Sequence, residues 1–324
     1  MNASLKTGDL AFVPRGEIDR ARNLNASAVE RAALFADIAR LNTLSMIAHA
    51  GSGHIGTSFS SLDIVSWLFL NELRGVEAGA PQDIFFSSKG HDVPALYAVM
   101  IGCGLLPEDG LFQLRRRGGL PGHPDVATPH IVTNTGSLGM GISKAKGMVT
   151  AHRRAGVEAN IFVMTGDGEL QEGQIWESLV SAANDGLGEI TAIVDHNKFQ
   201  SDIRVSETSD LGDLEAKFSA FGWRVARCDG HDIETMAAIL RDFRMERDVP
   251  KVLIADTIKG RGVSFMEHTA MGPADRLYRF HSGAPDAEAY GRAAAELIER
   301  IDAKFDRFGA AAVELRRTAT PSRA

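Results

Sequence analysis

Ile161-Phe162-Val163-Met164-Thr165-Gly166-Asp167-Gly168 is the stretch that decides the fold, because an apolar run suited to a buried parallel strand leads directly into a glycine-flanked carboxylate. A second apolar run, Ile190 to Val194, leads to Asn197, and residues 172–185 between the two runs have helical spacing. Strand, helix and strand in this order form a right-handed crossover. The sequence therefore predicts an open, doubly wound α/β layer with a mainly parallel sheet and helices on both faces.

Asp167 and Asn197 are expected to lie side by side at the carboxyl edge of this sheet, where such folds bind ligands. A carboxylate and an amide oxygen are hard ligands of the kind that Mg²⁺ prefers, and the ion completes its shell with water and phosphate oxygens. Gly166 and Gly168 would let the backbone approach phosphates closely. We therefore predict a site for a magnesium ion and a diphosphate. The plainer alternative is a turn in which Asp167 caps the next helix.

Helical and strand patterns alternate along the rest of the chain. The other strand candidates are Ile84 to Phe86, Ile131 to Thr133, Trp223 to Cys228 and Val252 to Asp256. A capping box, Ser27-Ala28-Val29-Glu30, begins a long helix that Gly51 ends, and a further helix begins near Leu62. We expect one domain, residues 26–310, between a mobile polar leader (1–25) and a fraying polar tail (311–324).

Composition indicates a globular intracellular protein, with 44% apolar and 24% charged residues. The net charge of −7 argues against general nucleic-acid binding. The two cysteines imply no disulfide framework, and no apolar run approaches the roughly twenty residues that span a bilayer. Residues 1–22 lack the apolar core of a signal peptide. We expect a cytoplasmic protein with neither a nucleic-acid nor a membrane partner.

Several glycine-bearing loops occur in an order that resembles the transketolase family. Gly-Asp-Gly followed thirty residues later by Asn is similar to the thiamine-diphosphate motif. The other matching loops are Ser52-Gly53-His54-Ile55-Gly56, with Ile55 where the family usually has proline, Ser88-Lys89-Gly90-His91, Pro121-Gly122-His123-Pro124-Asp125, Thr133-Asn134-Thr135-Gly136-Ser137-Leu138-Gly139, and Lys259-Gly260-Arg261-Gly262 ahead of His281-Ser282-Gly283. The resemblance spans nearly the whole chain. It implies a thiamine-diphosphate-binding fold of the diphosphate-domain type, in the amino-terminal subunit of a split transketolase.

The run from Gly51 to Gly56 also matches the Gly-x-Gly-x-x-Gly fingerprint of dinucleotide-binding proteins. That fingerprint requires a strand before it and a helix opening on it. A long helix is predicted before Gly51 instead, which makes a nicotinamide-dependent oxidoreductase the weaker interpretation.

The resemblance implies that thiamine diphosphate and Mg²⁺ are the cofactors. It assigns the metal to Asp167, Asn197 and the carbonyl of Phe199. It also places five further groups against the cofactor, namely His91, Gly136, Leu138, Gly166 and Gly168. The implied reaction moves a two-carbon ketol unit from a ketose or ketose phosphate to an aldose or aldose phosphate.

Three histidines, His54, His123 and His281, are the candidates for proton transfer at the donor hydroxyls, because histidine titrates near neutral pH. His268 is an alternative to His281, since the stretch from Glu267 to Pro273 departs from the family pattern. Glu172 matches the acidic residue that meets the partner's activating Glu in this family. Its plainer interpretation is a carboxylate at the start of a helix.

The resemblance also implies a second subunit. The family's activating Glu lies in a pyrimidine-binding domain, so we expect a partner that carries this domain and the carboxyl-terminal domain, in an assembly of two copies of each subunit. That partner would supply most of the groups that bind an acceptor's phosphate. Two alternatives are a non-catalytic scaffold and a subunit of another thiamine-diphosphate enzyme, either deoxyxylulose-phosphate-synthase-like or dehydrogenase-like. The sequence does not assign the donor and acceptor sugars.

Overall fold

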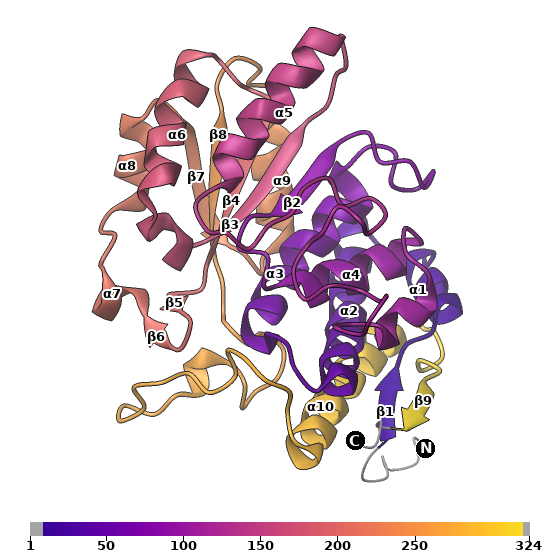
Figure 1. Cartoon of the computed structure of the whole chain (residues 1–324). Coiled ribbons are helices and arrows are strands. Elements are labelled where there is room, and N and C mark those ends of the chain that lie inside the picture. The colour runs from indigo at the N-terminus through magenta and orange to yellow at the C-terminus, as the bar shows by residue number, and fades with distance from the viewer. Residues whose placement is uncertain (1–8, 320–324) are drawn as a thin grey trace.

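Five parallel strands form the central sheet of the computed structural model, which describes residues 9–319 (Figure 1). Their order across the sheet is β2 (Ile84–Ser87), β3 (Ile161–Gly166), β4 (Ile190–His196), β8 (Lys251–Asp256) and β7 (Arg224–Asp229). The register between β3 and β4 ends with Gly166 opposite Asp195. The loops that carry Asp167 and Asn197 therefore leave the same edge of the sheet, and the predicted crossover is confirmed.

Helices cover both faces of this sheet (Figure 1). The core on one face includes residues of α2 (Ala28–Ala50), α3 (Ile55–Trp67), α4 (Val93–Cys103), α9 (Ile233–Phe243) and α10 (Ala287–Arg307), and the core on the other includes α5 (Gly141–Ala155), α6 (Gly173–Asn184) and α8 (Leu214–Ala220). Successive residues of a strand point to opposite faces. Phe162 accordingly joins the first core and Val163 the second. The predicted doubly wound α/β fold is confirmed.

The predicted capping box begins α2. Ser27 and Glu30 exchange both hydrogen bonds of the box, and Gly51 ends the helix in the left-handed conformation with φ 74°. The chain then passes through three residues into α3, which begins at Ile55. A helix rather than a strand precedes the glycine-rich run, so the run lacks the structural context of a dinucleotide fingerprint.

The mobile leader expected at residues 1–25 is wrong for the part that the structure describes. β1 (Asp9–Phe12) pairs antiparallel with β9 (Arg316–Ala319), and α1 (Arg15–Arg22) follows it. The side chain of Asn42 accepts a hydrogen bond from the Val13 amide at 2.8 Å and donates one to the Val13 carbonyl at 3.0 Å. Residues 316–319 of the expected fraying tail are likewise ordered by this pairing. Residues 1–8 and 320–324 lie outside the described part of the chain.

Two other predicted elements differ from the structure. Ile131 to Thr133 form no strand, and Val132 is 43% exposed in a loop that follows His130, whose φ is +63°. The helix expected from Leu62 begins earlier, at Ile55, and ends in a π-helical turn over Leu68–Glu72. Its first residues include small polar side chains that hid the helical pattern. Within residues 9–319, no helix has the length and apolarity needed to cross a membrane.

The shorter elements lie in the connections. The hairpin of β5 (Phe199–Gln200) and β6 (Ile203–Arg204), followed by the single turn α7 (Val205–Thr208), comes directly after β4. Short 3₁₀ turns cover Glu108–Phe112, Gly168–Gln171 and His268–Ala270. Two of these segments, the β5–β6 hairpin and the turn at Gly168–Gln171, border the cavity at the carboxyl edge of the sheet.

Candidate functional site

A cavity of about 240 Å³ opens where the loops after β3, β4 and β8 meet. Its lining includes nearly all of the candidates selected from the sequence, namely His54, His91, His123, Gly136, Leu138, Gly166, Asp167, Gly168, Asn197, Phe199 and His281. These residues come from seven separate segments of the chain. Glu172 is the one candidate that does not line the cavity.

Asp167 and Asn197 are fixed to one turn at the base of the cavity. The carboxylate of Asp167, 1% exposed, accepts hydrogen bonds from the amide of Gly168 at 2.8 Å and the amide of Lys198 at 2.5 Å. The side-chain oxygen of Asn197 accepts from the amide of Phe199 at 3.2 Å. Each oxygen accepts one protein hydrogen bond here and has a second lone pair for another ligand.

Electrostatics at this turn suit a bound cation. Burial raises the pKa of Asp167 to about 6, and the neighbouring Asp195 carboxylate adds to that effect. A divalent cation would oppose both effects by favouring the charged carboxylate. The donor set of one carboxylate, one amide oxygen and an adjacent backbone carbonyl consists of hard oxygen atoms, which fits Mg²⁺.

A buried ion pair beneath the cavity was not anticipated from the sequence. The ammonium of Lys89, 2% exposed, contacts Asp195 at 2.5 Å and Thr57 Oγ1 at 2.8 Å. Although burial alone would raise the pKa of Asp195, the adjacent ammonium lowers it. Asp195 also accepts from the hydroxyl of Ser60 at 2.7 Å. The pair therefore joins α3, the loop after β2 and the end of β4.

Three histidines from three different loops face one another across the cavity. The ring centroids of His54 and His91 are 5.1 Å apart, those of His54 and His281 are 5.2 Å apart, and those of His91 and His281 are 5.7 Å apart. Burial lowers the pKa of His54 to about 4 and that of His281 to about 3. Both rings are therefore neutral at pH 7, where each can accept a proton.

Unpaired polar atoms show that this cavity suits a polar ligand. The buried Nδ1 atoms of His54 and His281 and the side-chain oxygen of Gln200 have no hydrogen-bond partner within residues 9–319. Buried polar atoms are normally paired. A bound molecule with hydroxyl or amino groups would supply the missing partners.

Close packing also explains two of the glycine and histidine candidates. Gly136 has a φ of +112°, and a Cβ atom there would lie 2.7 Å from Cδ2 of His123. A side chain at Gly136 would therefore displace the His123 ring. His91 makes a hydrogen bond between its Nδ1 and the carbonyl of Lys89 at 2.9 Å, which orients its ring.

Glu169 has a structural role that its sequence context did not reveal. Its buried carboxylate accepts hydrogen bonds from the hydroxyl of Ser88, the amide of Gly139 at 2.9 Å and the amide of Gly166 at 3.2 Å. The side chain thus ties together three of the loops that line the cavity. The sequence offered no signal for this role, because the donors are a hydroxyl and backbone amides from distant segments.

Two candidates lie outside the cavity. Glu172 is exposed at the N-cap position of α6, and a Cβ atom at Gly139 would lie 2.7 Å from its own Cβ. His268 accepts a hydrogen bond from the amide of Lys259 at 3.0 Å and packs against the Phe199 ring, with centroids 5.2 Å apart. His281, rather than His268, therefore faces the cavity.

A second unanticipated lysine reaches the cavity from the loop after β8. Lys259 donates from Nζ to the carbonyl of Ser201 at 2.7 Å. Burial lowers the pKa of its ammonium to about 8, while the carboxylate of Asp167 opposes that shift. The loop matches the family pattern, but no property of the sequence alone indicated that Lys259 points inward.

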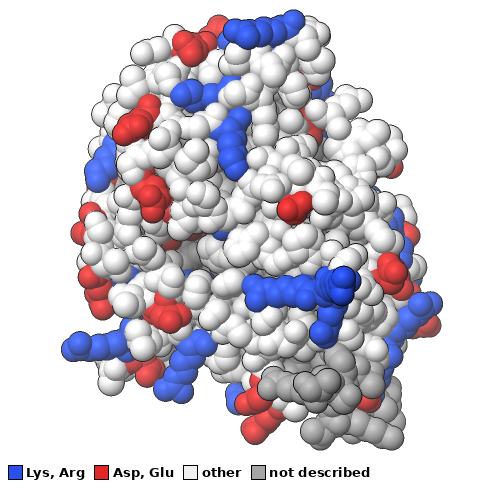
Figure 2. Space-filling view, in the orientation of Figure 1, with Lys and Arg blue, Asp and Glu red and all other residues white. Residues whose placement is uncertain are grey.

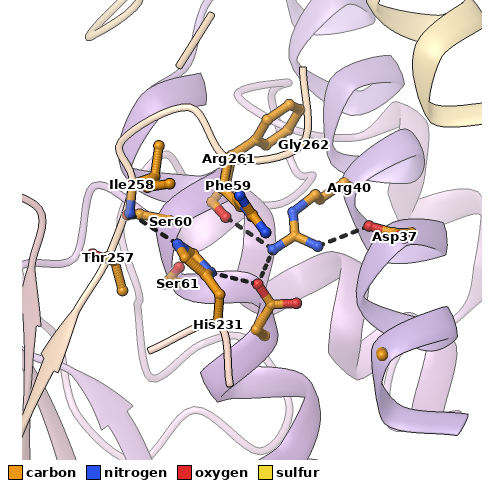
Figure 3. Close-up of polar contacts among 12 residues, drawn as sticks. Asp37, Arg40, Phe59, Ser60, Ser61, His231, Thr257, Ile258, Arg261 and Gly262 are labelled. Atoms are coloured by element: carbon orange, nitrogen blue, oxygen red, sulfur yellow. Dashed lines mark hydrogen bonds and ion pairs between the residues drawn. The ribbon is translucent and has the colours of Figure 1, made fainter. Parts of the chain in front are cut away.

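A buried network of charged side chains holds this loop in place (Figure 3). Arg40 pairs with Asp37 at 3.0 Å and with Asp63, whose carboxylate also contacts Nδ1 of His231 at 2.7 Å. Nε2 of His231 in turn accepts a hydrogen bond from the amide of Ile258 at 2.8 Å. Because Nε2 is an acceptor, Nδ1 carries the proton that binds Asp63. The network thus links α2 and α3 to the residue that precedes Lys259.

Comparisons with known proteins agree with the loops and the fold. Residues 31–275 match the family model described as the thiamine diphosphate binding domain of transketolase. One of the two subunits named for the apulose-4-phosphate transketolase of Phocaeicola vulgatus is 33% identical over 279 residues, which are 85% of this chain and 96% of that protein. The 6-deoxy-6-sulfo-D-fructose transketolase subunit SqwG of a Clostridium species is 38% identical over 72% of this chain and 86% of that protein.

Solved structures share the fold. Transketolase from Leishmania mexicana superposes with a TM-score of 0.67 at 24% identity, over 88% of this chain and 46% of that chain. The Campylobacter jejuni enzyme gives a TM-score of 0.69 at 23% identity, over 89% of this chain and 44% of that chain. This chain thus spans less than half of either solved chain. From the family model and the curated relatives together, the chain belongs to the transketolase family and contains its thiamine diphosphate binding domain.

Proposed function

We propose that this chain is the amino-terminal subunit of a two-chain transketolase that moves a two-carbon ketol unit between sugars or sugar phosphates with thiamine diphosphate and Mg²⁺. The observation that supports this most strongly is the convergence of Asp167, Asn197 and three histidines on one cavity. The relatives from Phocaeicola and Clostridium, most of whose length this chain covers, are themselves named as transketolase subunits.

The residues present fit both cofactors. Asp167, Asn197 and the carbonyl of Phe199 would hold Mg²⁺ through oxygen atoms. The groups around the diphosphate and the adjoining ring would be His91, Gly136, Leu138, Gly166 and Gly168, which all line the cavity. When bound, thiamine diphosphate supplies the electron sink for breaking and forming the carbon–carbon bond.

The three candidate catalytic histidines would act on the donor sugar. His54 and His281 are neutral at pH 7 and have unpaired Nδ1 atoms, so each can bind a hydroxyl and accept its proton. Gly136 holds the ring of His123 at the cavity wall. Glu172 is exposed beside this cavity, where the carboxylate of a second protein chain could approach it.

Reconstitution tests this proposal. The chain would be purified alone and together with a candidate partner that carries a pyrimidine-binding domain, and ketol transfer would be measured with a panel of ketoses and aldoses. We expect activity only from the mixture, and only when thiamine diphosphate and Mg²⁺ are present. Robust transfer by the chain alone, in a preparation that mass spectrometry shows to be free of partner, would refute the two-chain proposal.

A histidine variant separates a catalytic subunit from a scaffold. In the reconstituted complex, His54→Ala should retain affinity for the cofactor and lose most of the turnover, because its ring would contact the donor rather than the diphosphate. A scaffold role predicts unchanged turnover. Equal loss of cofactor binding and turnover would place His54 at the diphosphate instead.

A further inference from the structure

Three consecutive arginines, Arg115, Arg116 and Arg117, lie on the loop between α4 and α5 and are exposed. Figure 2 shows basic side chains gathered on this face of the molecule, in the region that the loop occupies in Figure 1. None of the three forms an ion pair with a carboxylate in the part of the chain that the structure describes. An exposed cluster of positive charge without counter-charges attracts anions.

Arg115 differs from its neighbours because its backbone is fixed. Its φ is +56°, a conformation that residues other than glycine rarely adopt. Its amide donates to the carbonyl of Leu120 at 2.7 Å, and the amide of Leu120 donates to the carbonyl of Gln113 at 2.8 Å. These bonds close a tight turn. The start of the Arg115 side chain is therefore held in one direction.

The guanidinium of Arg115 lies between two loops that carry histidines of the cavity. Its Nη1 donates to Ser52 Oγ at 3.0 Å, two residues before His54. Its side chain also packs on Gly122, where a Cβ atom would lie 2.7 Å from Nε, directly before His123. Burial lowers the pKa of both histidines, and the positive charge of Arg115 lowers it further. Arg115 is thus close to both rings at the entrance to the cavity.

The other two arginines do not reach this position. Arg116 donates to the carbonyl of His49 at 2.8 Å, and the side chain of Arg117 has no hydrogen-bond partner within residues 9–319. A guanidinium offers five N–H donors in a rigid plane that matches two oxygens of a tetrahedral anion. Arg115 uses one donor for Ser52, so most of its donors are available to a ligand.

We propose that Arg115 binds the anionic end, a phosphate or a sulfonate, of the sugar that enters this cavity. The inference rests on the proposed ketol transfer and adds a substrate class to it. It also assigns to this chain an anion contact that we expected the partner to supply. Both candidate groups are tetrahedral oxyanions that a planar guanidinium can bind through two oxygens.

Steady-state kinetics of the Arg115→Gln variant in the reconstituted complex test the proposal. The donors are D-xylulose 5-phosphate and 6-deoxy-6-sulfo-D-fructose, each compared with its uncharged counterpart, D-xylulose or D-fructose. We expect KM for at least one anionic donor to rise about tenfold or more, with kcat and the KM of the neutral donors unchanged. Which anionic donor is affected distinguishes a phosphate site from a sulfonate site. Arg115→Lys should recover part of the loss, because it keeps the charge without the planar fork.

Arg117→Gln is the matched control, because it removes the same charge from the same loop two residues away and should leave every KM unchanged. Equal losses with anionic and neutral donors in Arg115→Gln would overturn the proposal, since the arginine would then only support the histidine loops. Unchanged KM for both anionic donors would also overturn it.

A complex that transfers no ketol unit from any donor would refute the proposed function rather than the anion site. Binding of inorganic phosphate, measured by calorimetry on the complex, then decides the role of Arg115. We expect Arg115→Gln to weaken phosphate binding about tenfold relative to wild type and to Arg117→Gln. Equal affinity in all three proteins would overturn the anion site.

Discussion

Burial makes the histidines of the cavity sensitive to mild acid. The pKa of His54 is lowered to about 4 and that of His281 to about 3, whereas an unfolded chain has values near 6.5. Between these limits the unfolded state binds protons that the folded state does not. The free energy of unfolding therefore increases with pH across this window, and the folded state loses stability as the pH falls below about 6.5.

We expect replacement of one of these histidines to reduce the pH dependence of stability. In His281→Gln, the free energy of unfolding should fall less than in wild type between pH 6.5 and pH 4, by about 1 kcal/mol once solvent access to the ring is discounted. Urea denaturation at several pH values measures this difference. His130→Asn, at an exposed position with φ +63°, is the control and should follow wild type. Parallel curves for His281→Gln and wild type would contradict the effect of burial.

The metal assignment predicts a loss that depends on charge. Asp167→Asn keeps the shape of the side chain and one acceptor oxygen but removes the negative charge that would face Mg²⁺. Calorimetry on the assembled complex should show affinity for thiamine diphosphate and Mg²⁺ reduced by at least about tenfold. Glu177→Gln, an exposed carboxylate on α6, should bind as wild type does. Unchanged cofactor affinity in Asp167→Asn would remove Asp167 from the metal site.

Residues of the site differ in how far the sequence could predict them. Asp167, Asn197 and the cavity histidines each stand in a local motif, so their loops were identifiable without a structure. Lys89 could not be assigned, because its carboxylate partner, Asp195, is 106 positions away in the sequence. Its burial depends on how α3 and the strands pack together. Long-range pairing of this kind leaves no local signal.

At the scale of elements, the loop after β8 is held by neighbours from both sides. Thr257 donates its hydroxyl to Asp195 at the end of β4, and Ile258 donates its amide to His231 before α9. His231 in turn binds Asp63 of α3. The position of Lys259 therefore depends on the packing of elements on one face of the sheet.

We expect His231→Ala to loosen this loop. The variant leaves the Asp63 carboxylate and the Ile258 amide without the histidine, which should lower the free energy of unfolding by about 2 kcal/mol. Faster hydrogen exchange at residues 257–262 should accompany this loss. His231→Asn, which retains a donor and an acceptor, should recover part of the stability. Wild-type exchange rates in His231→Ala would show that the network does not hold the loop.

Elements with strong local signals were predicted well, and those that depend on distant partners were not. The capping box at Ser27 and the left-handed Gly51 fixed both ends of α2. β1 was missed because it is short and pairs with β9 at the other end of the described chain. The strand expected from Ile131 to Thr133 was wrong, since an apolar triplet does not show whether a neighbouring strand is available for pairing.

At the scale of the whole molecule, the cavity uses loops from both halves of the chain, from Ser52 to His281. All of the cavity histidines therefore come from one polypeptide. In the proposed enzyme, the partner would complete the site beside exposed Glu172 rather than rebuild it. Closed two-fold symmetry is the common outcome when such sites occur in pairs.

We expect the complex with its partner to contain two copies of each subunit. Light scattering coupled to size exclusion should give the corresponding mass, and thiamine diphosphate should bind more weakly to the chain alone, since half a site bears the full cost of ordering the cofactor. The Glu172→Lys variant places an opposite charge at the proposed contact and should reduce turnover of the complex. A fully active complex with one copy of each subunit would contradict the two-fold assembly.

The pairing of β1 with β9 has a consequence for how the protein is made. The register joins Asp9 to Ala319, so a ribosome must release almost the entire chain before this small sheet can form. Until then, Leu10 and Phe12, which are buried in the finished protein, have no strand partner and remain available to chaperones. The earliest described segment to be synthesised is therefore among the last to reach its final place.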